Sequence, residues 1–254
     1  MLLALDIGNT NIVMGISHNG DWVHRWRIQT DADKTADEYY VLFSNLFTES
    51  NLSFSDLDQI IISSVVPQLT QTINEVLINY ADTTPLVLNG DVETGIILDT
   101  DSPDTVGADL IADAVGGYAL VESDCIVVDF GTATTVMAVE QPGKLTGVAI
   151  CAGLKVTIDA LVGKAAQLSQ IPLEPPPQVI GQNTMEAMQS GLVVGHLCMV
   201  EGLVGRMEKE LEANSIKVIA TGGLAEKIGP YTDIFDVIDP MLTLDGLQTI
   251  MNRQ

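Results

Sequence analysis

The pattern of apolar and polar residues along the chain predicts alternating strands and helices. The first apolar stretch, residues 2–16, contains a Gly-Asn-Thr-Asn turn, and residues 22–28 then alternate as a strand with one buried face does. Residues 35–50 carry apolar side chains at helical spacing. Further strands are predicted at 59–66, 86–88, 125–131, 136–139, 146–150 and 217–220, and further helices at 69–80, 106–120, 153–168, 184–211 and 244–252.

One part of this pattern occurs twice. In both copies an apolar strand ends at an aspartate, a glycine follows two residues later, and a threonine comes within the next two positions. The copies read Asp6-Ile7-Gly8-Asn9-Thr10 and Asp129-Phe130-Gly131-Thr132. Internal repetition indicates a duplicated fold. The sequence therefore predicts two α/β lobes, residues 1–115 and 116–254, that pack around a cleft.

The repeated turns carry chemistry suited to a nucleotide. Glycine has no Cβ, so the backbone of such a turn approaches a ligand closely, and its N–H groups and threonine hydroxyls bind phosphate oxygens. The aspartate at the strand end holds Mg²⁺, usually through water, and the metal bridges the phosphates. A third glycine turn, Thr221-Gly222-Gly223, also follows a strand. Together these turns favour nucleotide binding over ordinary Asp-Gly turns.

Composition and charge exclude several classes of function. The chain has 254 residues, 46% of them hydrophobic, which is too apolar for a disordered chain. Its 34 acidic against 11 basic residues give a net charge of −23, which disfavours nucleic acid and anionic membranes as partners. No signal peptide or membrane span is predicted, and three scattered cysteines without a CxxC pair indicate neither disulfides nor zinc. We expect a cytoplasmic protein.

Six motifs, in order along the chain, resemble those of the type III pantothenate kinases, members of the acetate kinase, sugar kinase, Hsp70 and actin superfamily. The resemblance implies a duplicated actin-like (ribonuclease H-like) fold, each lobe a mixed sheet flanked by helices. The motifs are Asp6-Ile7-Gly8-Asn9-Thr10-Asn11, Ser64-Val65-Val66-Pro67, Val106-Gly107-Ala108-Asp109, Asp129-Phe130-Gly131-Thr132-Ala133-Thr134-Thr135, Gly181-Gln182-Asn183-Thr184 and Ala220-Thr221-Gly222-Gly223.

The resemblance implies ATP-dependent phosphorylation of pantothenate, the first step of coenzyme A synthesis, by a homodimer that needs Mg²⁺ and a monovalent cation, K⁺ or NH₄⁺. It makes Asp109 the general base, although an aspartate at a helix start more often satisfies free N–H groups. Asp129 would hold the monovalent cation and Asp6 the Mg²⁺ through water. ATP binding falls to Asp6, Ile7, Gly8, Asn9, Thr10, Asn11, Ile12, Val13, Thr132, Gly222 and Gly223, and substrate binding to Thr100, Gly107, Ala108, Asp109, Leu110 and Thr184.

The chain departs from the family pattern mainly on the acceptor side. Leu110 stands where the family has arginine, Thr100 where it has tyrosine, Ala152 where it has proline, and Asp113 where it has asparagine. Leucine offers neither the charge nor the paired donors of arginine. Three hypotheses stay open: a divergent pantothenate kinase, a paralogue that phosphorylates another small hydroxy compound, and a non-catalytic nucleotide-binding regulator.

Overall fold

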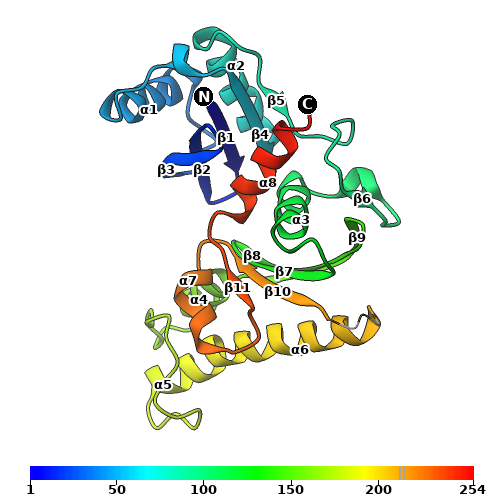
Figure 1. Ribbon diagram of the computed structural model, residues 1–254. Coiled ribbons are helices and arrows are strands. Elements are labelled where there is room, and N and C mark those ends of the chain that lie inside the picture. Colours follow the sequence, from blue (N-terminus) through cyan, green and yellow to red (C-terminus); the bar gives the residue numbers. More distant parts are fainter. Residues whose placement is uncertain (212, 214) are drawn as a thin grey trace. The chain divides into compact units, whose positions relative to one another are not determined.

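Two mixed β-sheets covered by helices make up the computed structural model, which describes residues 1–211, 213 and 215–254 (Figure 1). Each sheet belongs to one of two compact units. The first unit contains residues 1–95, 102–116 and 243–254, and the second contains residues 96–101 and 117–242. The chain thus enters the first unit three times, whereas the sequence predicts a single boundary near residue 115.

The first sheet has the strand order β3-β2-β1-β4-β5. β1 pairs antiparallel with β2 and parallel with β4, so it lies in the centre. Asn19 and Gly20 both have positive φ, which is the backbone of the tight hairpin turn that Asn-Gly favours between β2 and β3. The strands are β1 Leu2–Ile7, β2 Asn11–His18, β3 Asp21–Gln29, β4 Gln59–Ser64 and β5 Leu86–Val87.

Two helices pack together on one face of this sheet. α1 (Ala36–Glu49) begins at a capping box of Thr35 and Glu38, and α2 (Pro67–Tyr80) begins with proline at its first position. Both pack their apolar faces on the sheet in one core. α8 (Leu242–Met251) joins the first unit from residue 243, and Trp22 of β3 donates a hydrogen bond of 2.6 Å to its Asp245.

The second sheet repeats this arrangement in the order β11-β10-β7-β8-β9-β6. β7 pairs antiparallel with β8 and parallel with β10, as β1 does with β2 and β4. The order β3-β2-β1-β4-β5 thus recurs as β9-β8-β7-β10-β11, with β6 added at one edge. The strands are β6 Ile97–Leu98, β7 Cys125–Phe130, β8 Ala133–Glu140, β9 Lys144–Ala152, β10 Lys217–Thr221 and β11 Val237–Ile238.

The helices of the second unit differ from the predicted ones in two details. The helix expected at 153–168 ends at Lys164, and the helix expected at 184–211 contains a π-helical segment at Gln189–Val194. α3 begins in the first unit and ends in the second. The helices are α3 Ala108–Val121, α4 Leu154–Lys164, α5 Thr184–Met188, α6 Gly195–Glu210 and α7 Ala225–Ile228, with 3₁₀ turns at Phe54–Asp56, Pro103–Thr105 and Gly229–Tyr231.

One helical run among the described residues, Thr184–Glu210, is long and apolar enough to cross a membrane, with a mean hydropathy of 1.3. Its Val193, Val200 and Val204 pack in the core of the second unit beside α4 and the sheet. The core helix of a folded unit passes the same test of length and composition, so this run is weak evidence for a membrane span.

Candidate functional site

Asp6 lies on β1, the central strand of the first sheet, close to the end of that strand. It is paired in register with Val13 on β2 and with Ser63 on β4. Ser63 is fully buried and donates a hydrogen bond of 3.0 Å from its hydroxyl to Asp6 Oδ1. The sequence motif does not include Ser63, because the two residues become neighbours only through the parallel pairing of β1 and β4.

The turn after Asp6 is closed by backbone hydrogen bonds. Gly8 donates its N–H to the carbonyl of Asn11 at 3.0 Å, and the Thr30 hydroxyl donates to the Gly8 carbonyl at 2.6 Å. Asn9 and Thr10 at the tip are exposed, while the flanking Ile7 and Ile12 are fully buried. The isoleucine side chains therefore belong to the core, and a ligand of this segment meets its backbone and the exposed tip.

Asp109 lies in the first turn of α3, within the same unit as Asp6. Its Oδ1 accepts a hydrogen bond of 2.8 Å from the Leu110 N–H. A Cβ on Gly107 would come within 2.4 Å of this oxygen, so the glycine leaves space that the carboxylate uses. The N–H contact fits the structural interpretation of a helix-start carboxylate, and it also fixes the direction of the side chain.

Asp6 and Asp109 are close enough to interact electrostatically. The pKa of Asp6 is raised to about 7, first by burial and second by the negative charge of Asp109, against the opposing effect of the Ser63 hydrogen bond. Burial also raises the pKa of Asp109, opposed by the backbone N–H of Leu110. Carboxyls with raised pKa values in one place are typical of sites that bind cations or move protons.

In the second unit, Asp129 holds the position that Asp6 holds in the first. It is paired in register with Thr135 on β8 and Thr221 on β10. Gly222 has a φ of +91°, and a Cβ there would come within 1.9 Å of Asp129 Oδ1. The glycine is required both by the backbone conformation and by the carboxylate that fills the space.

Gly153 supports the second turn from behind. Its N–H donates to the carbonyl of Thr132 at 3.1 Å, and a Cβ would come within 2.3 Å of the same oxygen. The residue before it, Ala152, pairs with Ala133 at the other side of the turn. Alanine in place of the family's proline therefore leaves this support intact.

The remaining candidate residues differ in how far they are exposed. Thr132 and Gly223 are exposed, and Thr184 is exposed at the start of α5. Thr100 is half-buried with an unpartnered hydroxyl, and Leu110 is half-buried on α3. Asp113 is 1% exposed and accepts a hydrogen bond of 2.6 Å from Thr243, so this departure from the family pattern joins α3 to the segment of α8 in the first unit.

The aspartate oxygens of the candidate site suit a cation whose other ligands are water and phosphate oxygens. Among the described residues, no group of three or more His, Cys, Asp or Glu side chains is placed to hold a metal ion. Mg²⁺ at phosphate sites is bound by one or two carboxylates, with waters and phosphate oxygens completing its shell. Asp6, which is buried and within range of the charge of Asp109, fits that role without a larger acidic cluster.

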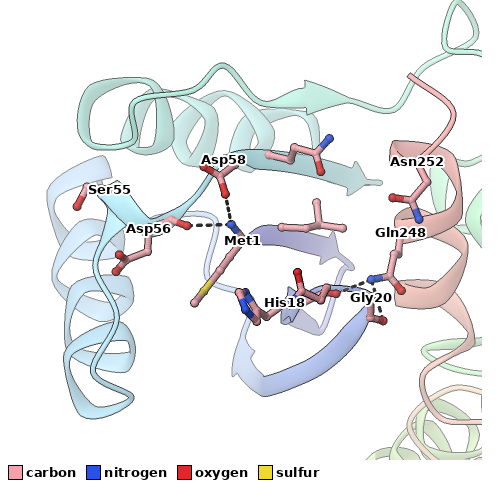
Figure 2. A pocket seen from close by; sticks show the side chains of 12 residues that line it. Met1, His18, Gly20, Ser55, Asp56, Asp58, Gln248 and Asn252 are labelled. Carbon is pink, nitrogen blue, oxygen red and sulfur yellow. Dashed lines mark hydrogen bonds and ion pairs between the residues drawn. The ribbon is translucent and has the colours of Figure 1, made fainter.

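A hollow of about 790 Å³ lies elsewhere on the first unit (Figure 2). It opens at the Met1 end of β1, whereas Asp6 is near the other end. Figure 2 shows the N-terminal ammonium paired with Asp58, and Gln248 of α8 reaching the Gly20 carbonyl. None of the sequence-predicted site residues lines this hollow, so it is separate from the candidate site.

Comparison with known proteins identifies close relatives over the whole chain. The sequence model of the type III pantothenate kinase family matches residues 2–206. The type III pantothenate kinase of an Exiguobacterium species is 42% identical over 253 residues, covering 100% of this chain and 99% of that protein. The enzyme of Moorella thermoacetica is also 42% identical over 253 residues, with the same coverage.

Solved structures of low sequence identity share the fold. A Campylobacter jejuni protein named for the Baf family of transcriptional activators has a TM-score of 0.63 at 19% identity, covering 99% of this chain and 98% of its own. The ROK hexokinase of Thermus thermophilus has a TM-score of 0.52 at 12% identity, with coverages of 99% and 98%. The predicted α/β architecture, two mixed sheets flanked by helices, is confirmed, and these two solved structures share it.

Proposed function

Because the chain belongs to the type III pantothenate kinase family, we propose that it transfers the γ-phosphoryl group of ATP to the primary hydroxyl of pantothenate, the first step of coenzyme A biosynthesis. The observation that carries the proposal is the match to this family over the length of the chain, and within one unit of the structure the charge of Asp109 helps to raise the pKa of Asp6. These two residues are the aspartate of the first glycine turn and the aspartate that the family resemblance makes the general base.

Asp109 receives the proton of the acceptor hydroxyl as the phosphoryl group transfers. Phosphoryl transfer needs mainly positioning and charge stabilisation, with one carboxylate to orient and deprotonate the nucleophile. The raised pKa of Asp109 improves its strength as a base. The hydrogen bond from the Leu110 N–H holds the carboxylate in one orientation.

The nucleotide-binding residues follow the family assignment. Asp6 to Val13 bind the phosphates through the exposed turn tip and the backbone, and the family assignment adds Thr132, Gly222 and Gly223 as ATP contacts. Asp6 would hold Mg²⁺ through water, and the ion would supply charge neutralisation on the phosphate oxygens. Asp129 would bind a monovalent cation, K⁺ or NH₄⁺.

Purified protein with Mg²⁺, K⁺, ATP and pantothenate tests the proposal directly. We expect ADP release that depends on pantothenate, with phosphopantothenate identified by mass spectrometry. Folded protein without turnover above the pantothenate-free rate would contradict it. ATP binding in that protein would then favour the non-catalytic regulator.

Leu110 and Thr100 motivate the alternative that the acceptor is another small hydroxy compound. Thr100 keeps a hydroxyl without a partner, and Leu110 adds an apolar side chain beside the general base. Pantothenate carries a carboxylate that neither residue pairs by charge. A screen of pantoate, pantetheine and sugar acids would show whether another acceptor is turned over with higher kcat/KM.

We predict that Leu110→Arg lowers KM for pantothenate about tenfold, because a charge-assisted hydrogen bond to a carboxylate contributes about 1.5–3 kcal/mol. Steady-state kinetics with varied pantothenate measures the change, and KM for ATP should stay the same. Leu110→Met, which adds no charge, is the matched control. A raised or unchanged KM in the arginine variant would show that the acceptor pocket has been rebuilt around leucine.

We also propose a cytoplasmic homodimer formed through the second unit. Ile150, Val156, Val179, Ile180 and Met185 are large apolar side chains exposed by 43–83%, and all fall between β9 and α5. Exposed apolar residues gathered in neighbouring segments are typical of a subunit interface. The net charge of −23 disfavours nucleic acid and anionic membranes as partners.

Sedimentation velocity is expected to give twice the chain mass of 27.1 kDa. Ile180→Asp should weaken dimerisation at least about tenfold, because a carboxylate would be desolvated in the interface. Val41→Asp is the control, because Val41 is also an exposed apolar residue but lies on α1 of the first unit. This variant should leave the mass unchanged. A monomeric wild-type chain would contradict the proposed dimer.

A further inference from the structure

Two buried hydroxyl groups without hydrogen-bond partners lie on either side of Asp129. Thr135 is 8% exposed and Thr221 is 1% exposed, and neither hydroxyl oxygen has a partner. Both residues are paired in register with Asp129, from β8 and from β10. Residues paired in this way project from the same face of a sheet. Three side chains that carry oxygen atoms therefore lie side by side across β10, β7 and β8.

Burying a hydroxyl without a hydrogen-bond partner costs free energy. Two such hydroxyls next to one carboxylate therefore indicate that a ligand binds there. In the described part of the chain, only five buried side-chain polar atoms lack a partner. Two of the five flank Asp129, and the other three belong to Asn74, Thr100 and Ser190 in other segments.

The first unit shows what the same position looks like when the hydroxyl is already used. There Val13 and Ser63 take the places of Thr135 and Thr221, as partners of Asp6 in register. Ser63 donates its hydrogen bond to Asp6, and Val13 has no oxygen. The second unit thus offers one additional oxygen, and neither of its hydroxyls is bonded to a protein group.

We propose that the hydroxyl oxygens of Thr135 and Thr221 complete, with the Asp129 carboxylate, a three-oxygen site for a monovalent cation. The inference uses one part of the proposed function, namely that Asp129 holds this cation. One carboxylate and two neutral oxygens carry a charge of −1, which a monovalent ion neutralises. Ca²⁺ takes more oxygen ligands than these three, and Mg²⁺ is bound mainly together with substrate phosphates. Both threonines are β-branched, so their hydroxyls are held in few rotamers before the ion binds.

Thr135→Val and Thr221→Val remove the oxygens while keeping nearly the same shape. The thermal midpoint of each full-length variant is measured with Mg-ADP in KCl and in tetramethylammonium chloride at equal ionic strength. We expect wild type to unfold at a higher temperature in KCl, and both valine variants to lose that difference. The K⁺ concentration for half of the effect should rise about tenfold or more in any variant that retains a response.

Two further variants separate ligand loss from general damage. Thr135→Ser keeps an oxygen and should retain the K⁺ response. Thr146→Val removes a hydroxyl from β9 of the same sheet, one that already donates to the Ala138 carbonyl, and should also retain it. In tetramethylammonium the Thr135 and Thr221 valine variants should unfold no earlier than wild type, because they lose an unpartnered polar group. Earlier unfolding there would overturn the proposal.

The outcomes also separate this inference from the kinase assignment. Valine variants that respond to K⁺ as wild type does would overturn the three-oxygen site. A wild-type chain that turns over pantothenate but has the same midpoint in both salts would overturn it as well and leave the kinase activity standing. A K⁺ response that disappears in both variants supports the site even where no acceptor is phosphorylated.

Discussion

Replacing Asp109 by asparagine is expected to lower kcat about 10²- to 10⁴-fold, because the acceptor hydroxyl loses its general base. Asparagine keeps the shape of the side chain and an oxygen that accepts from the Leu110 N–H. The start of α3 and the thermal midpoint should therefore change little. Steady-state kinetics with saturating ATP and pantothenate measures the loss, and KM for ATP should remain close to the wild-type value.

The same variant has a second readout that a purely structural role for Asp109 would not produce. The negative charge of Asp109 helps to raise the pKa of Asp6, so its removal should lower the pKa of Asp6 from about 7. Titration of ¹³C-labelled aspartate carboxyls by NMR measures the shift. Asp104→Asn, at an exposed aspartate just before α3, is the control. Full activity in Asp109→Asn would remove this residue from the mechanism.

Local pattern was sufficient to predict most of the fold. Alternation and apolar runs located the long strands of both sheets, and the repeated Asp-x-Gly turns indicated the duplication that the strand orders display. The two-residue strands β6 and β11 and the four-residue helix α7 are too short to produce a periodic signal.

The return of α8 to the first unit could not be read from pattern, because it depends on contacts across the whole length of the chain. Trp22 bonds Asp245, and Thr243 bonds the buried Asp113 of α3. Neither pair is close in sequence, and each partner alone is compatible with a solvated polar residue. A single boundary near residue 115 follows from the repeat but takes no account of these bonds.

In the candidate site too, some residues can be found from local motifs and others only from the pairing of the strands. Asp6, Asp109 and Asp129 stand in motifs whose spacing is visible in the sequence. Ser63, Thr135 and Thr221 surround two of these carboxylates, but they do so through strand pairing, and polar residues near strand ends are common. The one signal in the sequence for these three residues was the alternation of side chains along a strand, which places every second residue of β4, β8 and β10 on the same face.

Asp6→Asn is expected to make the metal-free protein more stable and the enzyme far less active. The carboxyl of Asp6 has a pKa near 7 in the folded chain, against 3.8 as the ordinary value. Between these two values the folded state binds more protons than the unfolded state, so stability falls as pH rises from about 4 to 7. Above pH 7 the full cost of ionising Asp6 is present, up to about 4 kcal/mol by the size of the shift.

Asparagine is neutral at every pH and still accepts the Ser63 hydrogen bond, so it avoids this cost. Urea unfolding without Mg²⁺ should show the variant more stable than wild type at pH 8 and nearly equal to it at pH 4. Asp82→Asn, at an exposed position of the same unit, should show no such difference. Equal stability of Asp6→Asn and wild type at pH 8 would mean that the carboxyl is not desolvated.

Loss of activity should accompany the gain in stability, because the charge that is costly in the empty site is the charge that a cation requires. We expect kcat/KM for Mg-ATP to fall at least about 100-fold in Asp6→Asn. In wild type, the proton and the cation compete for Asp6, so the Mg²⁺ concentration for half-maximal activity should rise as pH falls below 7. That pH dependence should be absent in the asparagine variant, whose residual activity measures what the remaining residues contribute to holding the triphosphate.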